Sequence, residues 1–253
     1  MNIKKTKYGW KKDIPDFRDF IYRPAKKTLI SLPVKINLRS ECPPIYDQGK
    51  LGSCTANAIG AAFEFELIKQ KLNDFTPSRL FIYYNERAIE GSVNEDSGAQ
   101  IRDGIKSINK KGVCKETSWP YITSKFKNKP STKCYAEALK NQLISYHSLN
   151  NNLNTMKSCL ADGFPFVFGF SVYNSFESSD VAKTGTVKLP LKTENLLGGH
   201  AVCAVGYDDA LQRFIIRNSW GEAWGKGGYF TMPYAYLSNP KLSSDFWTIR
   251  LVE

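Results

Sequence analysis

The sequence predicts an α+β protein with two lobes, helical in its first half and β-rich in its second. Apolar side chains recur at helical spacing between residues 54 and 111. After about residue 145 the chain instead shows short apolar, β-branched and aromatic runs separated by turn residues. Helices and strands do not alternate, as they would in a doubly wound sheet. We expect a helical lobe over about residues 45–140 and a β-rich lobe over about 141–253.

The first half contains three predicted helices. They cover residues 54–71, 76–89 and 101–111, the first with small residues early and larger apolar residues later. Ser53 stands where a side chain can cap the first helix, and Gly112 follows the third in the position of a helix-ending glycine. The small residues of the first helix predict that it packs closely against its neighbours.

The second half contains one further predicted helix, at residues 154–162, and then five predicted strands. The strands are FPFVFGFSVY, HAVCAVGY, RFIIRNSW, GGYFTMPY and DFWTIRLV, each rich in residues that favour strands. Residues 174–199 form the least regular stretch. His147 precedes these strands in a polar segment, which we interpret as a linker with an exposed imidazole.

The net charge of +11 suggests a nucleic-acid-binding protein, but the distribution of this charge argues against specific binding. Residues 1–30 hold nine Lys and Arg against three Asp, so over half of the excess lies there. The rest of the chain has no long basic run and no aromatic-glycine RNA-binding signature. We expect a solvated basic face and no specific nucleic-acid partner.

The same residues 1–30 carry five aromatic side chains in a segment too charged to form a core of its own. Such side chains are buried only against another surface. We therefore predict an extended basic prosegment or arm, residues 1–30, that lies over a main domain of residues 31–253. A disordered tail is the alternative.

The composition argues against a membrane-spanning protein. The apolar fraction is 42%, mean hydropathy is −0.37, and no window approaches the roughly 18 continuous apolar residues of a spanning helix. The first lysines are not followed by the apolar stretch of a secretory signal. We expect a monomer in the cytoplasm or another reducing compartment, with secretion or packaging by another route left open.

The six cysteines show no CxxC pair and no histidine at metal-ligand spacing. They are Cys42, Cys54, Cys114, Cys134, Cys159 and Cys203. Neither a zinc site nor a disulfide framework is predicted, and most of the six are expected to be small buried hydrophobic residues, with room for one facultative pair. No metal or other cofactor is expected.

Cys54 opens the first predicted helix, where free backbone N–H groups and the helix dipole favour a thiolate. A cysteine that is merely buried is the alternative at such a position. Gln48 lies six residues earlier, in a segment whose two glycines allow close backbone approach to a ligand. The Gln48 amide and the Cys54 N–H form a candidate oxyanion hole for thiolate attack on a carbonyl.

A thiolate nucleophile generally needs a base, and the chain has two histidines. His200 follows two glycines and begins an apolar strand, where an imidazole needs a polar partner; a structural histidine is the alternative. Asn218 ends a later strand and can accept a hydrogen bond from the His200 ring. The indole of Trp220 would shield that bond from water.

These segments together resemble the papain and cathepsin family of cysteine peptidases over about residues 32–253. The resemblance rests on QGKLGSC at Cys54, on HAV and VGY from His200, and on NSWG at Asn218 followed by WG and GY. Cys54 and His200 are 146 residues apart, within the family's window of about 130–150. The resemblance implies a papain-like fold, with the active-site cleft between a mostly helical lobe and a β-barrel-like lobe.

The resemblance also implies a function. The chain would be a cysteine endopeptidase, made as a zymogen, that hydrolyses peptide or protein substrates through a thioester at Cys54. His200 would be the base, Asn218 its orienting partner, Gln48 the oxyanion donor and Trp220 the cover of the His–Asn pair. The N-terminal segment would act as the inhibitor. A Cys–His acyltransferase and a non-catalytic peptide-binding homologue remain as alternatives.

The chain departs from the family pattern beside the nucleophile, as a disulfide-poor, short-prosegment variant of the microbial or viral kind. Leu51 stands where the family has cysteine and Thr55 where it has tryptophan. For substrate binding the resemblance indicates Gly98, against the substrate backbone, and Ser244 or Asp245 at the floor of the pocket for the second residue before the scissile bond. An acid there would favour lysine or arginine in the substrate.

Overall fold

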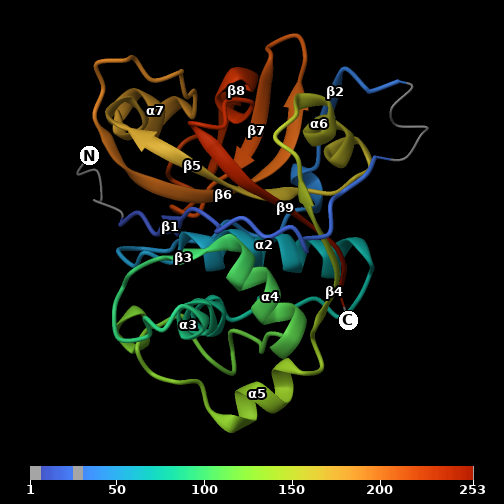
Figure 1. Ribbon diagram of the computed structural model, residues 1–253, viewed down its shortest axis with the longest axis vertical. Helices are drawn as coiled ribbons and strands as arrows, with labels where there is room; N and C mark the ends of the chain where they lie inside the picture. The colour runs from blue at the N-terminus through green and yellow to red at the C-terminus, as the bar shows by residue number, and fades with distance from the viewer. Residues whose placement is uncertain (1–6, 25–30, 253) are drawn as a thin grey trace.

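The computed structural model describes residues 7–24 and 31–252. Helices that follow α2 (Cys54–Lys69) in the first half of the chain form one layer, the strands with a few short helices form the other, and α2 lies between them (Figure 1). One side of α2 contacts helices and the other contacts the sheet. This position explains the composition of α2, because a helix covered on both sides must bury nearly every residue and gains from small ones. The predicted α+β class is confirmed.

The helical layer follows local signals that the sequence predicts. It contains α3 (Arg79–Ile89), α4 (Ile101–Lys111) and the shorter α5 (Thr132–Ala138), which was not predicted. The Ser78 hydroxyl accepts from the Phe81 N–H at 3.1 Å, so α3 begins three residues later than predicted. Gly112 ends α4 with a φ of +70°, a backbone conformation that favours glycine.

The strand layer is a seven-stranded antiparallel sheet that contains all five predicted strands. Its order is β4 (Leu143–Leu149), β9 (Ser243–Val252), β5 (Phe166–Tyr173), β6 (Leu196–Asp208), β7 (Arg213–Arg217) and β8 (Tyr229–Pro233), with β2 (Lys35–Asn37) paired to β6. Its core is largely aromatic; the rings of Phe168 and Phe246 stack with centroids 5.6 Å apart.

Shorter elements connect the strands. The predicted helix at residues 154–162 is α6 (Leu153–Ala161), while the irregular stretch of residues 174–199 begins with a 3₁₀ turn, η3 (Asn174–Glu177), and α7 (Ser179–Thr184). The remaining short elements are η1 (Arg39–Glu41), η2 (Thr123–Lys125) and α8 (Tyr234–Leu237). Within the described residues, none of the helices is long and apolar enough to cross a membrane.

The described part of the predicted arm, residues 7–24, runs along the junction of the two layers (Figure 1). Its strand β1 (Trp10–Lys11) pairs in parallel with β3 (Ala99–Gln100) of the helical layer. Further on, the Tyr22 N–H donates to the Ser148 carbonyl of β4 at 2.8 Å. The arm is therefore fixed at both ends by backbone hydrogen bonds. Residues 1–6 and 25–30 of the predicted segment lie outside the described residues.

Two interpretations of the sequence are wrong. Ser53 does not cap α2, because its side chain forms no cap bond and instead lies 2.5 Å from the Tyr121 hydroxyl. His147 is not in a linker: it is a half-buried residue of β4, opposite Thr248 of β9. Strand β4 lies at the edge of the sheet, where a polar sequence is tolerated and resembles a loop.

Candidate active site

Cys54 is the first residue of α2, and its side chain is fully buried. Backbone N–H groups of Ala201 in β6, Gly9 in the arm and Thr55 in α2 lie near its sulfur and act to lower the pKa of the thiol. Burial nevertheless dominates and raises the pKa of the thiol to about 11. The helix start thus supplies the N–H donors expected from the sequence, but the covered site holds a thiol.

His200 lies on β6 immediately before Ala201, whose backbone N–H lies near the Cys54 sulfur. Its Nε2 is 2.8 Å from Oδ1 of Asn218, the residue that follows β7. Its Nδ1 is buried and has no hydrogen-bond partner among the described residues. Burial lowers the pKa of the imidazole to about 4, against the opposing effect of the Asn218 bond.

Trp220 covers this pair. Its ring stacks on the His200 ring with centroids 4.9 Å apart and an interplanar angle of 29°. Phe176 packs against the other side of the indole, at 5.4 Å. The His200–Asn218 hydrogen bond is therefore shielded by aromatic rings, and a hydrogen bond in such a dry environment holds the imidazole orientation firmly.

Gln48 is fully buried and joins the two layers. Its Oε1 accepts from the Ser219 hydroxyl at 2.7 Å, while its Nε2 donates to the Leu51 carbonyl at 3.0 Å. A second, longer contact of 3.5 Å joins Nε2 to the Lys7 carbonyl of the arm. An amide donor is thus directed at a carbonyl oxygen in the cleft, as an oxyanion hole requires.

Two of the three candidate substrate-binding residues, Gly98 and Asp245, contact Gly9 and Trp10 of the arm. Gly98 has a φ of +70°, and a Cβ there would lie 2.0 Å from the Gly9 carbonyl oxygen, so a side chain would exclude the arm. Asp245 accepts from the Trp10 indole N–H at 3.0 Å. Ser244 precedes it on β9, and the Ser244 side chain acts to lower the pKa of the Asp245 carboxyl against the larger effect of burial.

Two further side chains of the site, Glu86 and Tyr121, were not predicted from the sequence. The Thr55 hydroxyl donates to Glu86 Oε2 at 2.8 Å, and burial raises the pKa of this carboxyl well above its ordinary range. Tyr121 donates to the Gln48 carbonyl at 3.0 Å and contacts Ser53. Both contacts join residues more than 30 positions apart in the chain. No local sequence pattern therefore predicts them.

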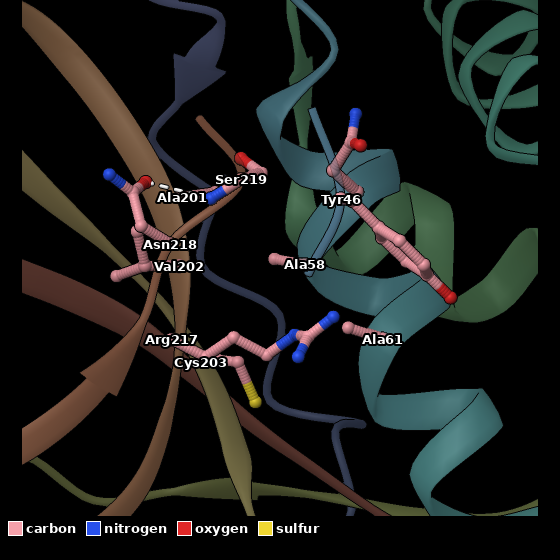
Figure 2. A pocket seen from close by; sticks show the side chains of 10 residues that line it. Tyr46, Ala58, Ala61, Ala201, Val202, Cys203, Arg217, Asn218 and Ser219 are labelled. Atoms are coloured by element: carbon pink, nitrogen blue, oxygen red, sulfur yellow. Dashed lines mark hydrogen bonds between the residues drawn. The ribbon is translucent and has the colours of Figure 1, made fainter. Parts of the chain in front are cut away.

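Figure 2 shows a pocket behind the site, between α2 and the sheet, with Ala58 and Ala61 on one side and Asn218 and Ser219 on the other. Its free space is about 10 Å³, enough for about one water-sized sphere. A substrate cannot enter it. Among the described residues no group of three or more His, Cys, Asp or Glu side chains is placed to hold a metal ion.

The arrangement of a helix-start cysteine, an imidazole and an orienting amide agrees with the comparisons to known proteins. Residues 32–243 match the family described as papain family cysteine protease. The chain belongs to this family. It is accordingly a cysteine protease, a hydrolase that acts on peptide bonds, and the predicted papain-like fold is confirmed.

Relatives of this papain-family chain include viral and microbial proteins. It is 45% identical to an uncharacterized peptidase C1-like protein of Acanthamoeba polyphaga mimivirus, over 97% of this chain and 87% of the relative. It is 30% identical to cysteine proteinase 1 of Entamoeba histolytica, over 77% of this chain and 61% of that protein. Xylellain, a cysteine protease from Xylella fastidiosa, shares 49% identity with a TM-score of 0.93, covering 99% of this chain and 98% of xylellain.

Proposed function

We propose that this papain-family protease is an endopeptidase made as a zymogen, with Cys54 as nucleophile and the arm as its inhibitor. The observation that carries the proposal is the position of Gly9, whose N–H lies against the Cys54 sulfur while its carbonyl accepts from the Ala99 N–H at 2.8 Å. The arm therefore occupies the place where a peptide would be attacked.

In the open enzyme the Cys54 thiolate attacks a substrate carbonyl, and the Gln48 amide with the Cys54 N–H stabilises the oxyanion. His200 then gives a proton to the leaving amine, which leaves a thioester on Cys54. Water, deprotonated by His200, hydrolyses the thioester and releases the acid product. Asn218 holds the imidazole in orientation throughout.

The closed form is inactive for two physical reasons. Burial raises the pKa of the Cys54 thiol to about 11 and lowers that of His200 to about 4, so the neutral pair is favoured over thiolate and imidazolium. In addition, the group that Gly9 presents to the sulfur is an N–H donor instead of a carbonyl carbon. The arm covers the nucleophile without offering it a bond to attack.

The pocket that Trp10 fills suggests what a substrate places there. The indole lies over Gly169 and donates to Asp245, so this pocket combines an apolar wall with a carboxylate. We propose that Gly98 lies against the substrate backbone and that Asp245, with Ser244 beside it, binds a basic side chain two residues before the scissile bond.

The Cys–His acyltransferase and the non-catalytic peptide binder are less favoured. A binder without turnover has no need of an oriented imidazole, yet His200 and Asn218 are paired in a site shielded by Trp220. An acyltransferase would transfer the acyl group of the Cys54 thioester to an added amine. Hydrolysis that is unchanged by the amine distinguishes the protease.

The test compares full-length protein, its Trp10→Ala variant and its Cys54→Ala variant on a fluorogenic peptide library. We expect Trp10→Ala to be activated and Cys54→Ala to be inactive. The ultraviolet absorbance of thiolate, measured against Cys54→Ala as blank, should appear at neutral pH in Trp10→Ala but not in the parent protein. Turnover by Cys54→Ala would contradict the nucleophile assignment, and equal activity of parent and Trp10→Ala would contradict the zymogen.

A further inference from the structure

A second acid of the cleft, Glu177, is bound by Tyr8 of the arm, which lies on the other side of Gly9 in the chain from the Trp10 that binds Asp245. The Tyr8 hydroxyl donates to Glu177 Oε1. Burial and the nearby carboxylate both raise the pKa of this hydroxyl, so it remains a proton donor. Glu177 is the last residue of η3 and is half-buried. Its carboxylate is therefore partly accessible in the cleft, where the Tyr8 side chain of the arm binds it.

The rings around Tyr8 identify this region as the leaving-group side of the cleft. The Tyr8 ring lies 6.2 Å from the His200 ring and 6.3 Å from the Trp220 ring. Because His200 must protonate the departing amine, the residue after the scissile bond passes beside His200 and Trp220. Trp10, by contrast, lies over Gly169 and donates to Asp245.

The surroundings of Glu177 suit a long side chain with a charged tip. Gly198 forms a flat wall, since a Cβ there would lie 2.8 Å from the Tyr8 Cβ. The preceding residue of η3, Phe176, is buried and joins the Trp220 indole to make an aromatic wall. Aromatic walls with one carboxylate at the end favour a guanidinium, which stacks on rings and binds a carboxylate with two hydrogen bonds.

We propose that Glu177 selects a cationic side chain, arginine before lysine, directly after the scissile bond. The inference rests on the proposed peptidase function and names its substrate class. With Asp245 binding before the scissile bond and Glu177 after it, the enzyme cleaves within basic segments of its substrates. The Tyr8 phenol occupies this subsite in the closed form as a neutral donor of similar length.

The test uses full-length protein carrying Tyr8→Ala and Trp10→Ala, which removes the arm side chains from both subsites. Quenched fluorescent peptides differ only after the scissile bond, with arginine, lysine, norleucine or glutamate. We expect kcat/KM for arginine to exceed that for norleucine about tenfold, the size of one hydrogen bond to a charged group. Glu177→Gln in the same background should reduce this ratio to near one.

Charge reversal gives a positive signal that a folding defect cannot produce. Glu177→Lys should invert the preference, so that glutamate after the scissile bond is cleaved faster than arginine. Glu194→Lys is the matched control, because Glu194 accepts from the Ser175 N–H of η3 but makes no contact with Tyr8 among the described hydrogen bonds. The arginine-to-norleucine ratio should survive in Glu194→Lys; its loss there would assign the preference to general negative charge and overturn the proposal.

The outcomes separate this proposal from the proposed function. Cleavage of the norleucine peptide with an unchanged arginine ratio in Glu177→Gln overturns the subsite and leaves the peptidase intact. Absence of turnover in every variant counts against the peptidase. In that event calorimetric titration of the short amides H-Arg-Ala-Ala-NH₂ and H-Nle-Ala-Ala-NH₂ still decides the subsite: tighter binding of the arginine amide that is lost in Glu177→Gln supports it, and equal affinities overturn it.

Discussion

Two segments of the described arm, residues 7–13 and residues 14–21, differ in how they contact the enzyme. Residues 7–13 lie in the cleft, where Gly9 and Asp13 are buried. Most side chains of residues 14–21 are exposed, that of Phe17 to 99%, although the Asp19 carboxylate is largely buried against Arg102. Apolar and hydrogen-bonded burial stabilises far more than exposed contacts do. The difference teaches that, in the proposed zymogen, most of the free energy that holds the arm in the cleft comes from residues 7–13, while residues 14–21 mainly connect them to the main domain.

Gly9 is the position at which a substitution should disrupt the contacts of residues 7–13 most completely. A Cβ on Gly9 would lie 1.8 Å from the Gly52 carbonyl oxygen, which is backbone and cannot move aside cheaply. Gly9→Ala should therefore displace residues 7–13 from the cleft and raise the kcat/KM of the full-length protein roughly hundredfold. This corresponds to a loss of about 3 kcal/mol in the free energy with which the arm binds the cleft.

The matched control for Gly9→Ala is Phe17→Ala, a larger truncation at an exposed site of the same arm. It should change kcat/KM less than about twofold, because its side chain buries almost no surface. Both variants are measured on one fluorogenic peptide at one pH. Equal activation by the two would show that inhibition is spread along the whole arm.

Asp13 makes closure depend on pH. Burial and the neighbouring Asp245 raise the pKa of the Asp13 carboxyl to about 7. The Trp247 N–H and Arg102 oppose this shift, because both favour the charged carboxylate of Asp13. Lys12 likewise favours the charged carboxylate of Asp245. In a released arm the same carboxyl is exposed, with an ordinary pKa near ~4. The closed form thus binds the proton more tightly. Its contribution to closure is complete below about pH 4 and is lost as the pH rises through about 7.

We therefore expect the activity of the full-length protein to rise about tenfold between about pH 6 and pH 8, relative to Gly9→Ala at each pH. The ratio to Gly9→Ala removes the pH dependence of catalysis itself. Asp13→Asn, which keeps the side chain's size and removes its titration, should flatten this ratio. Parallel pH profiles for the full-length protein and Asp13→Asn would show that another group controls closure.

The contrast between local and distant contacts explains what the sequence could predict. The stop at Gly112 and the apolar strands follow from local signals that act over a few residues, and the run of small and apolar residues after Cys54 predicted α2 although the Ser53 cap is absent. Cys54 and His200 were predicted to be nucleophile and base because their motifs appear in the order of the family they resemble. These features were accessible without coordinates.

The remaining features depend on contacts between distant segments. The Thr55–Glu86 and Tyr8–Glu177 hydrogen bonds form only when the two layers and the arm are assembled. The polar sequence of β4 misled the assignment of His147, because an edge strand needs no apolar alternation on its open side. Sequence patterns specify elements and motif residues, whereas the partners of buried carboxylates follow from tertiary packing.

Asp19 tests the segment of residues 14–21 and should give the smallest effect of the three sites. Its carboxylate lies 2.5 Å from the Arg102 guanidinium and 3.5 Å from the Lys106 ammonium, which come from α4. Asp19→Asn removes the ion pairs while the contacts of residues 7–13 remain, so kcat/KM should rise only about threefold, and less so at high salt. The measurement compares full-length parent and variant at low and high salt. Activation that matches Gly9→Ala would place the main inhibitory contact in residues 14–21 and reverse the comparison between the two segments.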